Sequence, residues 1–181
     1  MLGLKRGDVA LLPHDPSWEP EGARTVAELR EILGNIAVDI RHVGSTSIPT
    51  IPAKPIIDIA LAVRDLEDIT PMLEKLETVG YYLRPSTNAQ GELILARGSL
   101  YDGRGGLQTH FVHVVTHNSR QWQDYLSFRS YLIDHPESAA EYAALKLRLA
   151  RDHSTDRASY TAAKSSFIRE ILRKAALCYE R

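Results

Sequence analysis

The chain of 181 residues has one cysteine, three phenylalanines and two tryptophans. A single thiol cannot form an intrachain disulfide, so folding does not require an oxidising compartment. No apolar run approaches the roughly 20 residues that a membrane-spanning helix needs, and the sequence does not open on a charged-then-apolar leader. The net charge of −1 provides no basic field for non-specific binding to nucleic acid. We therefore expect a soluble, cytoplasmic protein with neither a membrane nor a nucleic acid as its partner.

The composition that remains is that of an ordinary globular protein, with 44% hydrophobic and 25% charged residues. The length suits one compact domain, or a core domain with a helical appendage. Residues 1–116 contain both strand-like alternating patterns and helical apolar patterns. After residue 119 every apolar pattern has helical periodicity. We expect an α/β core over residues 1–116 and a helical C-terminal subdomain over residues 117–181, packed together as one unit.

The patterns also place individual elements along the chain. Gly34 and Gly80 are typical stop signals for the helices that precede them. The glycine-rich segment 98–106 lacks the spacing of a nucleotide-binding loop, so we expect it to be a connection. The expected strands are residues 9–12, 36–41, 55–63, 81–84, 92–97 and 109–115, and the expected helices follow Ser17, the stripe 66–76, and three runs marked by Trp122, Tyr142 and Phe167.

A cluster of small polar residues follows the second expected strand. Gly44 stops that strand, and Ser45, Thr46 and Ser47 could bring hydroxyls and backbone N–H groups to a phosphate. The same residues would also serve as an ordinary helix cap. His42 continues the apolar set of the strand, so it is either a ligand-binding residue or a packed histidine.

Asp58 lies in the middle of the next expected strand. One alternating set of that strand is wholly aliphatic, while Asp58 shares the other face with Ala60 and Ala62. A carboxylate in such a position requires a cation, hydrogen-bond donors or solvent. Asp58 is therefore either a metal ligand beside the turn or a carboxylate bonded to Ser45 or to the turn amides.

The last expected strand carries two histidines. Because side chains alternate along a strand, His110 and His113 point to opposite faces, and at most one belongs to the site. Each could transfer protons or be packed with its ring nitrogens satisfied. Glu92 or His113 could supplement Asp58 as a metal ligand. Lys54 and Arg129 could supply positive charge to a phosphate. Four residues of the C-terminal helices could face the same site or lie on solvated helix faces: Lys146, Arg148, Lys164 and Arg173.

Taken together, these motifs resemble the GrpB family almost from end to end. The resemblance is carried by an ordered series of blocks rather than by any single motif. These blocks are residues 9–18, 42–49, 54–59, 109–115, 128–132, 135–137 and 141–146.

The resemblance implies a nucleotidyltransferase-like fold of the polymerase-beta type, a mixed sheet flanked by helices with a helical C-terminal part. Similar domains occur fused to dephospho-coenzyme A kinase, which implies a link to nucleotides or coenzyme A. In active nucleotidyltransferases a Gly-Ser turn cradles the triphosphate, and two acids spaced two residues apart hold the metals. Gly44, Ser45 and Asp58 match this pattern, whereas Ala60 stands where the second acid is expected.

We therefore expect the protein to bind a nucleotide or another phosphorylated small molecule at residues 44–47, with Lys54 and Arg129 supplying charge. If it is an enzyme, Asp58 and Glu92 would hold Mg²⁺ or another divalent metal during nucleotidyl or phosphoryl transfer to a small molecule. His110 or His113 would then move the proton. The alternatives are a non-catalytic nucleotide- or coenzyme A-related binding module, supported by Ala60, and a purely structural interaction domain.

Overall fold

A mixed β-sheet forms the centre of the computed structural model, which describes residues 1–85, 91–98 and 106–179. The sheet order is β2-β3-β6-β5-β4, and β1 pairs with the beginning of β6. β3 and β6 are parallel, while the other pairs are antiparallel. The strands are β1 (Leu4–Lys5), β2 (Asp39–Val43), β3 (Ile57–Val63), β4 (Tyr81–Leu83), β5 (Glu92–Gly98) and β6 (Leu107–Thr116).

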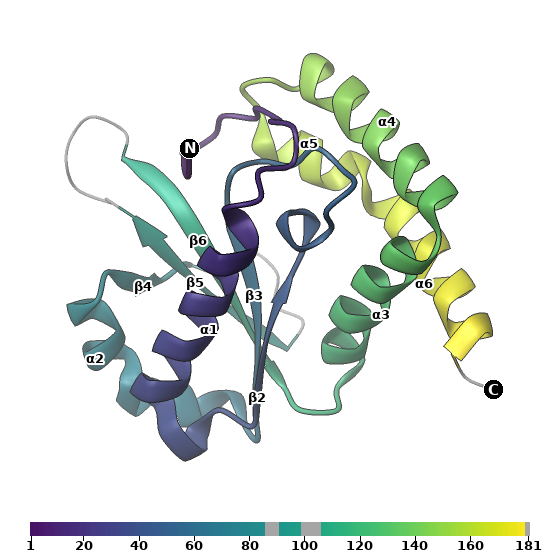
Figure 1. The fold of residues 1–181 in the computed structure, drawn as a ribbon. Helices are drawn as coiled ribbons and strands as arrows, with labels where there is room; N and C mark the ends of the chain where they lie inside the picture. Colours follow the sequence, from purple (N-terminus) through teal and green to yellow (C-terminus); the bar gives the residue numbers. More distant parts are fainter. Residues whose placement is uncertain (86–90, 99–105, 180–181) are drawn as a thin grey trace.

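Helices cover both faces of this sheet (Figure 1). α1 (Trp18–Leu33) and α2 (Leu73–Thr78) share the largest core cluster with the aliphatic face of β3 and with Val112 and Val114 of β6. On the other face, Trp122 of α3 packs against Ala60 and Ala62. The helices after β6 are α3 (Arg120–Asp134), α4 (Pro136–Asp152), α5 (Arg157–Ala163) and α6 (Ser165–Tyr179).

The C-terminal helices are anchored to the polar turn rather than to the sheet alone. The turn forms the 3-10 helix η2 (Ser45–Ser47), and the buried Ile48 and Ile51 follow it. Both isoleucines belong to a core cluster with buried side chains of α3, α4 and α6. Burial of each aliphatic side chain contributes roughly 1.5–3 kcal/mol. The position of the turn is thus coupled to helices that lie far along the chain.

The expectation of a mixed sheet flanked by helices, with a helical C-terminal part, is confirmed. Asp58 does share the face of Ala60 and Ala62, and His110 and His113 do point to opposite faces. The proposed division at residue 116 stays a prediction.

Several element boundaries differ from the expectation. Residues 9–12 form no strand, because the only pairing there is one bridge between Leu12 and Ala53. The second strand begins at Asp39, since the chain first turns through the 3-10 helix η1 (Gly34–Ile36). The stripe 66–76 is divided into η3 (Leu66–Met72) and α2, with Pro71 inside η3. Residues 117–179, the described portion of the C-terminal part, contain four helices, one more than expected.

Two expected connections, most of the loop 85–88 and most of the glycine-rich segment 98–106, lie outside the described residues. In the part of the chain that the structure describes, no helix has both the length and the apolar character needed to cross a bilayer.

Gly22 of α1 provides a test of how closely the helix lies on the sheet. A Cβ at Gly22 would overlap with the His42 ring, reaching 2.6 Å from its Cγ. An exposed helical Gly→Ala change normally stabilises by about 1 kcal/mol. Here we expect Gly22→Ala to lower the free energy of unfolding by about 2 kcal/mol, because it overpacks this contact. Urea denaturation measures the effect, and Gly22→Ala combined with His42→Ala should cost less than the sum of the single changes.

Candidate functional site

The polar turn lies directly against Asp58. In the β2–β3 pairing, Val43 is opposite Asp58, so Gly44 continues past the carboxylate. Gly44 has φ +68°, and a Cβ there would lie 2.6 Å from Oδ2 of Asp58. Glycine is thus required twice at this position, for its backbone conformation and for the space that Asp58 occupies.

The three hydroxyls of the turn have different surroundings. Thr46 Oγ1 donates to the Ile56 carbonyl at 3.4 Å and lies 3.0 Å from Nε2 of His42, while Ser47 Oγ donates to the Gly44 carbonyl at 2.7 Å. These two hydroxyls shape the turn from within. The side chain of Ser45 interacts with the hydroxyl of Tyr142 from α4. Ser45 is therefore the hydroxyl that connects the turn to the helical part.

Asp58, His113 and Glu92 come together from three neighbouring strands. Nε2 of His113 lies 3.5 Å from Oδ1 of Asp58, and Nδ1 of His113 lies 2.7 Å from Oε1 of Glu92. Tyr125 of α3 donates its hydroxyl to the same Glu92 oxygen at 2.6 Å. The imidazole thus lies between two carboxylates, under a tyrosine that orients one of them.

The carboxylates determine the charge of this group. Burial would favour the neutral imidazole, yet hydrogen bonds and charge from Asp58 and Glu92 raise the pKa of His113 to about 9. Burial also opposes ionisation of the two acids, and His113 outweighs it, so the pKa values of Asp58 and Glu92 are lowered. At neutral pH the three groups are an imidazolium between two carboxylates.

Three lysines lie near Asp58, around the rings of Tyr142 and Tyr160. Nζ of Lys54 and Nζ of Lys164 lie 5.3 Å and 4.5 Å from the Tyr160 ring centroid. Lys146, only 2% exposed, donates to the Pro52 carbonyl and lies 4.7 Å from the Tyr142 centroid. Each of the three amines interacts electrostatically with Asp58.

Burial and mutual repulsion weaken the basicity of these amines. Desolvation, with Lys164 nearby, lowers the pKa of Lys54 to about 7 and that of Lys146 to about 7. Desolvation lowers the pKa of Lys164 to about 8. Within residues 1–85, 91–98 and 106–179, no carboxylate forms an ion pair with any of the three. The three lysines therefore form a cluster of amines with lowered pKa values and no carboxylate ion-pair partner in this part of the chain.

The other predicted site residues, His42, His110 and Arg129, do not join the group around Asp58 and His113. His42 faces α1, where burial lowers its pKa to about 4, and His110 lies on that same face with Nε2 3.4 Å from Oε1 of Glu21. Arg129 lies one helical turn beyond Tyr125, and its buried Nε has no hydrogen-bond partner among the described residues. The structure therefore unites residues 44 and 45 with Asp58, Glu92, His113 and the three lysines, and it places His42 and His110 on the far face.

The donor set does not fit a pair of divalent cations. No group of three His, Cys, Asp or Glu side chains is placed to hold a metal ion in the part of the chain that is described. Asp58 and Glu92 are both engaged by His113, and Ala60 contributes no oxygen. That Asp58 and Glu92 hold Mg²⁺ or another divalent metal stays a prediction.

Three tyrosines were not predicted as site residues. Tyr125 lies four residues before Arg129 on the same helix face, a spacing that could have indicated it. Tyr142 has the spacing of a core residue, and its hydroxyl contact to Ser45 depends on the docking of α4. Tyr160 lies on α5, a helix that the pattern did not predict.

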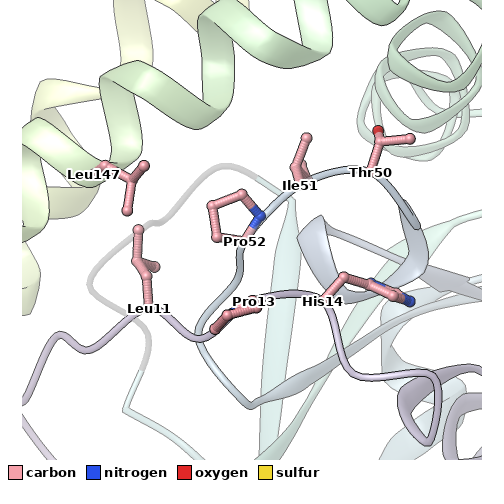
Figure 2. A pocket seen from close by; sticks show the side chains of 7 residues that line it. All are labelled: Leu11, Pro13, His14, Thr50, Ile51, Pro52 and Leu147. Atoms are coloured by element: carbon pink, nitrogen blue, oxygen red, sulfur yellow. The ribbon is translucent and has the colours of Figure 1, made fainter.

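A separate apolar pocket of about 360 Å³ lies between the N-terminal segment, the loop after η2 and α4 (Figure 2). Its lining includes neither the lysine cluster nor Asp58 or Glu92, so the pocket does not suit a phosphate. The residues lining it are Leu11, Pro13, His14, Thr50, Ile51, Pro52 and Leu147.

Comparison with known proteins agrees with the resemblance seen in the sequence. The family model described as GrpB protein matches residues 8–174. The chain belongs to the GrpB family. A relative named glutamate-rich protein GrpB, from Alkalihalophilus pseudofirmus, is 36% identical over 95% of this chain and 98% of its own length. The crystal structure of conserved protein GrpB from Enterococcus faecalis has a TM-score of 0.84, at 29% identity, covering 95% of this chain and all of that one.

Two further matches are more distant. A dephospho-CoA kinase from Mycolicibacterium paratuberculosis is 29% identical over 95% of this GrpB-family chain, which spans 47% of the kinase. A structure of Cid1 in complex with its short product ApU has a TM-score of 0.46 and 14% identity, covering 75% of this chain and 39% of that one.

The charge on His113 predicts a pH-dependent stability. Its folded pKa of about 9 exceeds the ordinary 6.5, so its contribution is complete below pH 6.5 and is lost as the pH rises through 9. We expect the stability advantage of the wild type over His113→Gln to shrink by up to roughly 3 kcal/mol between pH 6 and pH 10. Denaturant unfolding at both pH values measures it. His117→Gln, whose ring lies beside Trp122, controls for loss of an imidazole, and a constant advantage would contradict the assignment.

Proposed function

We propose that this GrpB-family protein binds a nucleotide or another phosphorylated small molecule at the three lysines beside the 44–45 turn. The observation that carries the proposal is the cluster of three amines without a carboxylate ion-pair partner among the described residues, since Lys54, Lys146 and Lys164 all lie near Asp58, which already faces His113. Partly buried cations without counter-ions are costly. A phosphate would supply the missing negative charge and accept charge-assisted hydrogen bonds.

The surroundings of the lysines also suit such a ligand. Tyr160 holds Lys54 and Lys164 from opposite segments of the chain, one before β3 and one after α5. Ser45 and Gly44 bring a small-residue turn to the same carboxylate. The similarity to part of a dephospho-CoA kinase makes coenzyme A and its precursors reasonable nucleotides to test alongside ATP.

Binding without chemistry is the function that the geometry supports best. Phosphoryl and nucleotidyl transfer rely on positioning and on neutralising the charge of the phosphates, usually with the help of metal ions. Here both available acids are engaged by His113, and Ala60 replaces the second acid of the strand. We therefore favour the binding module over the transferase, and a product assay with each bound nucleotide distinguishes them.

Removing one amine should weaken binding of the ligand. We expect Lys54→Gln and Lys164→Gln each to raise the dissociation constant for ATP or pyrophosphate by about tenfold or more, because a charge-assisted hydrogen bond contributes about 1.5–3 kcal/mol. Isothermal titration calorimetry measures this. Lys174→Gln is the matched control, since its ammonium pairs with Glu170 on α6. Equal effects of all three changes, or no binding of any phosphorylated probe to the wild type, would refute the proposal.

The affinity should also depend on pH. An anion stabilises the protonated lysines, whose pKa values in the free protein are lowered to about 7 and 8. Affinity for pyrophosphate should therefore fall as the pH rises from 7 to 9, with proton uptake on binding. Calorimetry in buffers of different ionisation enthalpy detects that uptake. Lys54→Arg, which stays charged throughout, should flatten the profile, and a profile that is already flat in the wild type would argue against the lysines.

A further inference from the structure

The position of Ala60 explains how His113 fits between two acids. In the parallel pairing of β3 with β6, Ala60 is the direct partner of His113, and both face α3. Ala60 is completely buried, and its methyl group leaves room for an imidazole above the sheet. A carboxylate at position 60 would stand beside this ring. The missing acid and the histidine are thus two parts of one arrangement.

Both ring nitrogens of His113 face carboxylate oxygens. Nδ1 is 2.7 Å from Glu92, and Nε2 is 3.5 Å from Asp58. Carboxylates only accept hydrogen bonds, so Nδ1, which also lies 2.9 Å from the Tyr125 hydroxyl, donates to Glu92. A proton on Nε2 as well makes its 3.5 Å contact with Asp58 an ion pair, and the ring that carries both protons is the imidazolium. Glu92 is held further by the Tyr125 hydroxyl at 2.6 Å. A positive charge is therefore fixed between the two acids by the fold itself.

This charge affects the neighbouring lysines. Without a cation beside them, Asp58 and Glu92 would repel a phosphate approaching Lys54 and Lys164. Divalent metals have this neutralising role in phosphate sites that are built from clustered acids. A protonated histidine on a strand can neutralise the acids in the same way, and unlike a bound metal ion it is a covalent part of the protein.

We propose that His113 is the built-in cation of this site, standing between Asp58 and Glu92 where a divalent metal ion would otherwise be held, so that the phosphorylated ligand binds without a metal. The position of His113 as a cation stands independently, and the statement about the ligand rests on the proposed function. His113 is in this sense a positioning residue that acts through Asp58 and Glu92.

Titration with Mn²⁺ alone tests the first half. The double variant His113→Ala, Ala60→Asp offers three carboxylates and should bind Mn²⁺ saturably. At the same Mn²⁺ concentrations we expect no saturable binding to the wild type. The gain should be at least about tenfold, the scale on which donor environments change metal affinity. His117→Gln, which changes the residue directly after β6, should show no saturable Mn²⁺ binding, like the wild type. Saturable binding of Mn²⁺ to the wild type that Asp58→Asn abolishes would overturn the proposal, and this result does not depend on whether the double variant folds.

Pyrophosphate tests the second half. The wild-type protein should bind pyrophosphate in EDTA at least as tightly as in magnesium chloride, and His113→Gln should weaken that binding in EDTA. Binding that is tenfold tighter with magnesium would overturn the proposal. If pyrophosphate binds in neither buffer, the proposed ligand function fails, while the Mn²⁺ titration still decides the role of His113.

Discussion

The parallel pairing of β3 with β6 is the constraint on which this site depends. It places Asp58 and Ala60 on the same face as His113, and the antiparallel partner β5 adds Glu92 to that face. A slip of one residue would turn these polar groups into the aliphatic core under α1. The register is held because Ile57 and Ile59 of β3, with Val112 and Val114 of β6, are fully buried in that core. Hydrophobic burial on one face therefore fixes the electrostatics of the other.

Two kinds of positive charge meet at Asp58, and they differ in origin. His113 keeps its proton because carboxylates lie on both sides, whereas the lysines lose basicity because they are buried beside one another. The first charge compensates acids within the protein, and under the proposed function the second is available to an anionic ligand. The two tyrosine rings under the lysines place these amines without neutralising them, since a cation–π contact leaves the charge intact.

Sequence patterns predicted the faces of the strands better than the limits of the elements. The alternation in β3 was strong enough to place Asp58 beside small residues, and the spacing of the two histidines separated them correctly. Residues 9–12 are an apolar run that suits a short strand, but Val9 and Leu11 pack with Leu149 and Tyr160, and the Val9 N–H donates to the Ser154 carbonyl. Their partners are turns and helices from the far end of the chain, which no local pattern contains.

By itself, the sequence determined the family, the mixed α/β class, the glycine at the turn and the side of the sheet on which Asp58 lies, because these follow from short-range periodicity and from ordered motifs. Only the tertiary structure decided that His113, and not His110, joins Asp58, that Glu92 and Tyr125 complete the group, and that Lys164 lies over the same tyrosine ring as Lys54. Those contacts join residues up to about a hundred positions apart. They are set by strand order and helix docking, in which the free energy comes from burial of distant side chains rather than from the residues of the site.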